Sequence, residues 1–148
     1  GMATTLLVCI TDVEGNCMLQ NVGDSRGFII NKAQIQHTKD HSYVQELVDA
    51  GQITPEEAIN HPLNNIISQA VGDPESILKP DRYVTNLREN VLLMSSDGLH
   101  DYVRKERIQE IVMNNLDDLR KTCEILVQEA LQKGSDDNIT VIVVKGSE

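Results

Sequence analysis

The fold of this chain is decided by one stretch, Asn90-Val91-Leu92-Leu93-Met94-Ser95-Ser96-Asp97-Gly98-Leu99-His100-Asp101. Its first half is a run of apolar residues, which predicts a strand buried on both faces. The run ends at Ser95-Ser96, and Asp97 then stands at the end of the strand, at the rim of a sheet where ligands are commonly held. We expect Gly98 to let the backbone turn tightly and to keep side-chain bulk away from the carboxylate. The alternative for this stretch alone is an aspartate that caps a turn.

Short strands separated by polar turns precede this stretch. The first two are expected to form a hairpin, and strands that follow one another in this way are typical of a mostly antiparallel meander. The expected strands cover residues 3–11, 17–22, 27–30, 34–37 and 82–87.

Helical signals interrupt the strands at residues 41–72. Ser42-Tyr43-Val44-Gln45 has the form of a capping box, and Gly51 stands where a helix-ending residue with positive φ belongs. A second helix begins at Thr54-Pro55-Glu56-Glu57, with the proline in the first helical position. The segment is either an inserted flap or a plain helical connection.

Helical spacing returns after the central stretch, over residues 104–113 and 117–132, and Gly134 follows as a stop. A strongly β-branched strand is expected at 138–144. The chain is therefore predicted to be α+β, with helices covering a sheet face.

Length and charge limit the classes of function. The chain has 148 residues, enough for one domain with a core, and a net charge of −10 from 13 Lys+Arg and 23 Asp+Glu. It has no basic stripe and only three Tyr and one Phe, so a nucleic-acid partner is not expected. No signal peptide and no bilayer-spanning apolar run is found, and we expect no membrane partner and a cytoplasmic location.

The three cysteines are Cys9, Cys17 and Cys123. None belongs to a Cys-x-x-Cys pair, so neither a zinc site nor a disulfide framework is indicated. We expect buried, reduced thiols.

Three aspartates stand where a strand meets a loop. Asp24 follows the strand at 17–22, Asp97 follows the central strand, and Asp137 precedes the strand at 138–144. If these strands are neighbours, their ends bring three carboxylates together, and such a group is favourable only when a cation neutralises it. Oxygen ligands favour Mg²⁺ or Mn²⁺. The alternative is three unrelated turn aspartates.

Four motifs of this chain resemble those of the metal-dependent PP2C-type (PPM) serine/threonine protein phosphatases, in their order and approximate spacing. The helical segment 42–58 is similar to the flap of the bacterial members. The motifs are Gly23-Asp24-Ser25-Arg26, Asp40-His41-Ser42, Ser96-Asp97-Gly98-Leu99 and Asp136-Asp137-Asn138-Ile139-Thr140-Val141. The resemblance implies that 1–148 is the carboxy-terminal two-thirds of a PP2C-like domain with a flap at 41–72. It also implies an antiparallel β-sandwich flanked by helices (α-β-β-α), incomplete at its N-terminus.

The resemblance also implies roles for the aspartates. Asp97 and Asp137 would be the catalytic ligands of a binuclear Mg²⁺ or Mn²⁺ centre, and Asp24 would help to hold a third, weaker metal that Asp97 also approaches. Asp136 would lie outside the ligand set, and Arg26 would brace the turn rather than clamp phosphate. The implied reaction is hydrolysis of phosphoserine and phosphothreonine on proteins by a metal-activated water.

One departure from the family pattern is that residues 1–20 contain no counterpart of the family's Asp-Gly-x-Gly-Gly motif, whose aspartate bridges both metals, or of its phosphate clamp. We therefore expect weak metal binding and low activity from the chain by itself. The alternative is a non-catalytic remnant or binding module that pairs with another chain. An open sheet edge would also favour a homo-oligomer or a strand-exchanged dimer.

Overall fold

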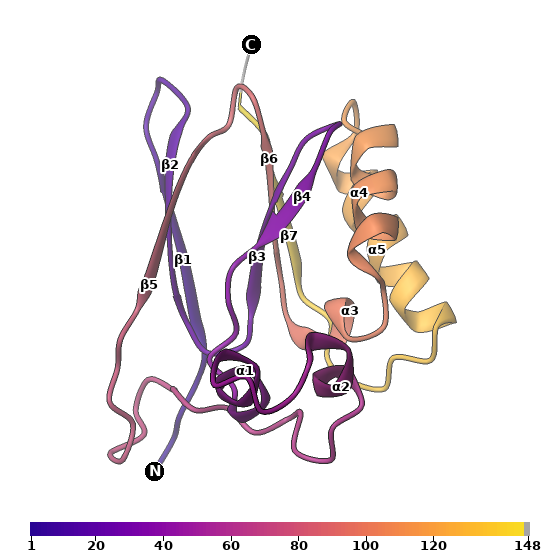
Figure 1. The fold of residues 1–148 in the computed structure, drawn as a ribbon. Helices are drawn as coiled ribbons and strands as arrows, with labels where there is room; N and C mark the ends of the chain where they lie inside the picture. Colours follow the sequence, from indigo (N-terminus) through magenta and orange to yellow (C-terminus); the bar gives the residue numbers. More distant parts are fainter. Residues whose placement is uncertain (147–148) are drawn as a thin grey trace.

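The computed structural model describes residues 1–146, so the last two residues of the predicted domain 1–148 lie outside it. Seven strands and five helices are assigned in this range, shown in Figure 1. The elements are β1 Leu6–Thr11, β2 Asn16–Val22, β3 Arg26–Ile30, β4 Ile35–His37, α1 Tyr43–Asp49, α2 Pro55–Ile59, β5 Asp81–Asn86, β6 Val91–Ser95, α3 Asp97–His100, α4 Lys105–Asn114, α5 Leu119–Gln132 and β7 Val141–Val144.

The strands form two antiparallel sheets, with the orders β1-β2-β5 and β4-β3-β6-β7. The predicted antiparallel pairing, the first hairpin and the β-sandwich implied by the resemblance are confirmed. The strands do not continue as one meander, because the chain changes sheets between β2 and β3 and returns at β5. The change happens at Gly23, which has a φ of 108° and lies so close to Thr5 that a Cβ would be 2.5 Å from Thr5 Cγ2. Alternation along a strand reports which residues are buried, not which sheet the strand joins.

The central strand β6 is buried on both of its faces, as predicted. Val91 and Leu93 point into a core shared with the helices, whereas Leu92 points into a second core between the two sheets. That second core joins Cys17 and Leu19 of β2 to Leu92, which makes the two sheets a sandwich. Strand β6 is an interior strand of the four-stranded sheet, because β3 and β7 pair with its two sides.

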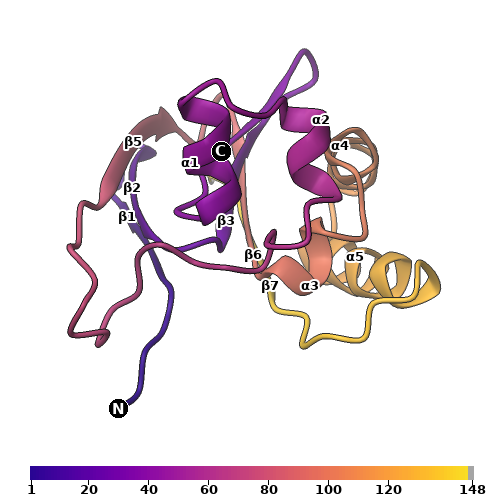
Figure 2. The ribbon, with the colours of Figure 1, turned by 60° about the horizontal axis from the view of Figure 1, so that its bottom comes forward.

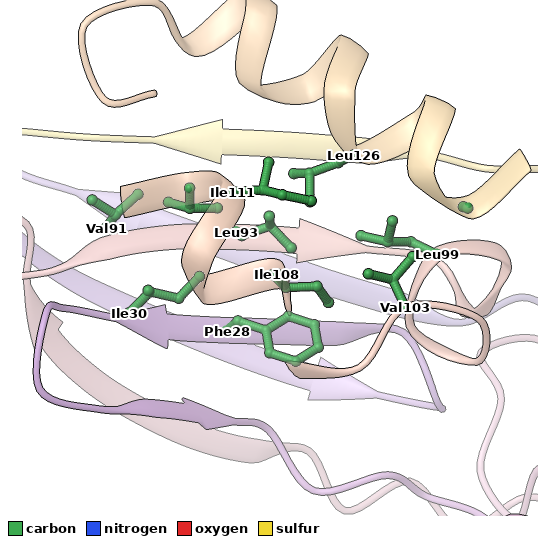
Figure 3. Close-up of a cluster of buried hydrophobic side chains, with 11 residues drawn as sticks. Phe28, Ile30, Val91, Leu93, Leu99, Val103, Ile108, Ile111 and Leu126 are labelled. Carbon is green, nitrogen blue, oxygen red and sulfur yellow. The ribbon is translucent and has the colours of Figure 1, made fainter. Parts of the chain in front are cut away.

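Helices α4 and α5 cover the outer face of the four-stranded sheet (Figure 1). Figure 3 shows the core that results, in which side chains of β3, β6 and the segment after β6 meet those of the two helices. Each fully buried aliphatic or aromatic side chain contributes about 1.5–3 kcal/mol relative to an exposed one. The labelled members are Phe28, Ile30, Val91, Leu93, Leu99, Val103, Ile108, Ile111 and Leu126.

The predicted helical excursion at 41–72 contains α1 and α2, which lie at the end of the molecule where β6 runs into α3 (Figure 1 and Figure 2). The box expected at Ser42 is half formed: Ser42 accepts from the Gln45 amide, but the Gln45 side chain donates to Asp49 instead of returning to the cap. The box between Thr54 and Glu57 is complete.

The two ends of this excursion are joined by backbone hydrogen bonds. Ser42 and Ile67 form an isolated antiparallel bridge, and the Ser68 amide donates to the His41 carbonyl at 2.9 Å. A second bridge joins Val71 to Thr4, so the residues before β1 are held against the excursion instead of extending the strand to residue 3 as expected. Within residues 1–146, no helix combines the length and apolar character needed to cross a bilayer.

Candidate functional site

The turn that carries Asp24 is held by buried side chains. Asn21 donates to the Gly23 carbonyl at 3.1 Å, and His41 accepts from the Gly23 amide through Nδ1 at the same distance. The other ring nitrogen of His41 lies 3.0 Å from an oxygen of Asp81 at the start of β5. The turn is therefore anchored to β2 and β5 of the three-stranded sheet, and the predicted position of Asp24 just after β2 is confirmed.

Asp24 lies among other carboxylates. Its pKa is raised to about 6, first because the side chain is partly buried and then because the charges of Asp97, Asp40 and Asp101 repel its own. Asp24 and Asp97 are 73 positions apart in the sequence, yet each is within reach of the other's charge. The structure thus brings two of the three predicted aspartates together.

Asp97 begins helix α3 rather than ending a strand in a tight turn, so the expected turn at Gly98 is wrong. Gly98 is needed for another reason: a Cβ there would stand 2.3 Å from the Asn138 carbonyl oxygen. The N-cap position of α3 is Ser96, which makes no side-chain capping hydrogen bond, so the capping alternative for Asp97 stays open. The Asp97 Oδ1 atom accepts the Gly98 amide at 2.9 Å.

Asp137 lies on the segment packed against that same helix start. The Ser96 hydroxyl donates to the Asn138 carbonyl at 3.1 Å and accepts the Thr140 amide at 3.0 Å, which fixes this segment beside α3. The carboxylate of Asp137 is exposed and accepts the Asn138 amide at 2.7 Å. Residues 138–140, expected to be part of the last strand, instead form this connection, and β7 begins at Val141.

Asp101 is a member of the group that the sequence reasoning missed. It lies at the surface, and its pKa is raised because the surrounding protein partly desolvates the carboxyl group and because Asp97, Asp40 and Asp137 repel its charge, although Arg26 opposes the shift. The charge of Asp137 therefore acts on Asp101, as do those of Asp97 and Asp40. Its spacing of four from Asp97 would have placed both on one helix face, had a helix been expected here.

Arg26 makes a two-pronged ion pair with Asp40, at 2.8 Å from Nε and 2.7 Å from Nη2. Both Nε and Nη2 are therefore used to hold Asp40, in the segment that follows β4. This contact agrees with the bracing role expected for Arg26. Asp136 is engaged too, because the Tyr102 hydroxyl donates to it at 2.6 Å.

His100, at the end of α3, packs beneath the surface against Ser95 and Phe28. It is buried, its Nδ1 lies 2.9 Å from the Ser95 hydroxyl, and its ring meets Phe28 edge-on. Burial, followed by the charge of Arg26, lowers the pKa of His100 to about 2, so the ring is neutral and acts as a packing and hydrogen-bonding group.

The donor chemistry of this acidic group fits a hard divalent cation, because the side chains are carboxylates whose mutual repulsion a cation relieves. The distances between these side chains, however, do not form a complete metal site. In the part of the chain that the structure describes, no three His, Cys, Asp or Glu side chains are close enough together to form a ligand set. The candidate site is the set of carboxylates around the start of α3 whose charges influence one another, Asp24, Asp97, Asp101 and Asp137, and it is named the acidic surface below.

Comparisons with known proteins identify the family of this chain. The family model described as Protein phosphatase 2C matches residues 59–139. Protein phosphatase PhpP of Streptococcus pneumoniae is 41% identical over 150 aligned positions, which cover 100% of this chain and 60% of PhpP. Serine/threonine phosphatase stp of Listeria innocua is 37% identical, over 98% of this chain and 57% of the relative.

Solved structures show the same partial coverage. A bacterial serine phosphatase with 39% identity superposes with a TM-score of 0.89 over 100% of this chain and 60% of its own. The catalytic domain of serine threonine protein phosphatase PstP, solved in complex with 2 manganese ions, has 34% identity and a TM-score of 0.80 over 97% of this chain and 58% of its own. The chain thus spans a little under two-thirds of these relatives, and the α+β fold of two antiparallel sheets with helices is theirs over that length. This chain therefore belongs to the protein phosphatase 2C family and resembles its bacterial serine/threonine phosphatases.

Proposed function

We propose that this chain supplies the carboxylates of a metal-dependent site that hydrolyses phosphoserine and phosphothreonine on proteins. The observation that supports the proposal is the mutual repulsion of the Asp24, Asp97, Asp101 and Asp137 charges, in a member of this family. Phosphorylated proteins are then the substrates, and Mg²⁺ or Mn²⁺ in a binuclear centre is the cofactor. The manganese ions in the PstP structure support that choice of metal.

The proposed roles follow the position of each side chain. Asp97 and Asp137, whose segments are joined through Ser96, would hold the same metal, and Asp24 would share a third, weaker metal with Asp97. When bound, the ions supply positive charge for the phosphoryl oxygens and lower the pKa of a water. Arg26 is occupied by Asp40, so phosphate contacts must come from other groups.

Hydrolysis of p-nitrophenyl phosphate, measured with and without Mn²⁺, tests this proposal. We expect Mn²⁺-dependent turnover that Asp97→Asn abolishes and that Asp137→Asn reduces nearly as far. Asp136→Asn is the matched control, because it is the adjacent carboxylate and its partner is Tyr102; its effect should be mild. Turnover that survives Asp97→Asn, or that needs no metal, would contradict the assignment.

A second candidate function is a non-catalytic module that pairs with another chain. One observation favours it: no three His, Cys, Asp or Glu side chains of residues 1–146 are close enough together to form a ligand set. In the same assay, an absence of turnover at every Mn²⁺ concentration, from protein that calorimetry shows to be folded, selects this candidate.

We also propose that a second copy of the chain covers the open side of the three-stranded sheet. Edge strand β1 and its neighbours expose apolar side chains that lie in one row across the sheet, Ile10, Met18 and Val84, and the first and last of these are 59% and 67% exposed. Such a row beside an unpaired strand edge favours association. Light scattering after size exclusion should give twice the chain mass, and Ile10→Lys should return the monomer. A wild-type monomer at all concentrations would contradict this proposal.

Residues 41–72 would act as a flap beside the acidic surface in the domain 1–148. This assignment is supported by the closed base of the segment and by the hydrogen bond between His41 and the Gly23 amide. We also propose a cytoplasmic location. Its support is that all three cysteines are free thiols, which is usual in a reducing compartment.

A further inference from the structure

Two cysteines that are eight positions apart in the sequence meet across the first hairpin. In the register of β1 and β2, Cys9 is opposite Leu19 and Cys17 is opposite Thr11. The two cysteines are therefore diagonal neighbours on the same face of the sheet. Their sulfur atoms are 3.3 Å apart. An S–S bond is about 2.05 Å long, so the atoms need to approach by about 1.3 Å to bond.

The two thiols differ in their exposure to solvent. Both belong to the core between the sheets, but Cys17 is 1% exposed whereas Cys9 on the edge strand is only half-buried. Burial, followed by its contact with Cys9, raises the pKa of the Cys17 thiol to about 12. An oxidant from solution therefore reaches Cys9 first, and Cys17 is positioned to react next.

We propose that Cys9 and Cys17 are a modification site, at which a peroxide closes a disulfide that joins β1 to β2. The Cys9 thiolate attacks hydrogen peroxide, which breaks the O–O bond and leaves a sulfenic acid and hydroxide. The Cys17 sulfur then attacks the Cys9 sulfur: the S–S bond forms, the S–O bond breaks, and the departing hydroxide takes the thiol proton as water. In total, two thiols and one peroxide give one disulfide and two waters.

The disulfide would act on the least supported strand of the three-stranded sheet. Among the described residues, β1 is an edge strand that pairs with β2 alone. Fraying of an edge strand separates Cys9 from Cys17, and a covalent link across the pair prevents it. Oxidation should therefore raise the melting temperature and slow hydrogen exchange of the β1 amides.

The test treats the whole chain with hydrogen peroxide and counts thiols. We expect loss of two thiols per chain, a fall in intact mass by two hydrogen atoms, and full reversal by dithiothreitol. A glutamyl endopeptidase that cleaves after Glu14 separates the two cysteines, so their fragments stay joined only if the disulfide has formed.

Three variants complete the test. Cys123→Ser is the matched control, because Cys123 is on α5, away from the pair, and this variant should still lose two thiols. Cys9→Ser and Cys17→Ser should both lose the linked fragments. Cys9→Ser is sufficient if the buried Cys17→Ser variant does not fold. Oxidation of Cys9 to sulfinic acid without a link, a disulfide between two chains, or three thiols that persist under peroxide would each overturn the proposal.

Discussion

Replacement of Gly98 by alanine tests how tightly α3 packs on the Asp137 segment. A Cβ at this position would stand 2.3 Å from the Asn138 carbonyl oxygen and 3.0 Å from its carbon, both of which are backbone atoms. An ordinary contact is more than 1 Å longer, so the two segments must separate. Overpacking of this kind costs about 1–3 kcal/mol or more, and the higher helix propensity of alanine returns at most about 1 kcal/mol. We therefore expect the free energy of unfolding to fall by about 2 kcal/mol.

Urea unfolding of the wild type and of Gly98→Ala measures this loss. For a chain of this size, about 2 kcal/mol corresponds to a melting temperature lower by about 4–8 °C. Gly27→Ala is the matched control: it too has no positive φ and lies within a buried part of the sandwich, but its Cβ would be 3.5 Å from Leu19, an ordinary contact. This control should change stability by less than about 1 kcal/mol. Equal stability of Gly98→Ala and the wild type would refute the argument that close packing against Asn138 requires glycine at this position.

The other predictions concern the core, the anchor of the Asp24 turn and a helix cap, and urea unfolding measures each of them. Leu126→Ala, at a fully buried position of α5, should lose about 2–5 kcal/mol, and a loss below 1 kcal/mol would contradict the core assignment. His41→Ala leaves the buried Gly23 amide without its acceptor and should lose about 2 kcal/mol, whereas His41→Asn, which keeps an acceptor near Nδ1, should recover part of this loss. Thr54→Ala removes the N-cap of α2 and should lose about 1 kcal/mol, compared with no change for Val13→Ala at a side chain that is 97% exposed.

The parts of the fold that the sequence predicted well are those with a strong local pattern. The apolar run of β6 and the helical spacing of α4 and α5 lie within a few residues of their predicted bounds. Helix α3 was missed because it is four residues long and too short to show any period. The division of the strands between two sheets came from the family resemblance and not from the strand pattern, because strand pairing across many residues leaves no local signal.

The candidate site divides in the same way. The sequence placed Asp24, Asp97 and Asp137 at strand ends, and the structure brings their segments together; their role as metal ligands stays a prediction. Asp101 was missed because its place in the group depends on α3. The meeting of Cys9 with Cys17 could have been found by counting residues outward from the turn at 12–16, because a hairpin fixes which side chains are neighbours.

The backbone bonds that join Ser42 to Ile67 and His41 to Ser68 have a consequence for how this protein can vary. The ends of the enclosed segment are held together whatever lies between them, so added residues change only the entropy of a closed loop. Doubling the length of such a loop costs only about 0.6 kcal/mol. Natural insertions, deletions or an engineered peptide tag should therefore be tolerated between α1 and α2, while the sandwich keeps its shape. A reporter group attached between α1 and α2 should therefore disturb the two sheets little.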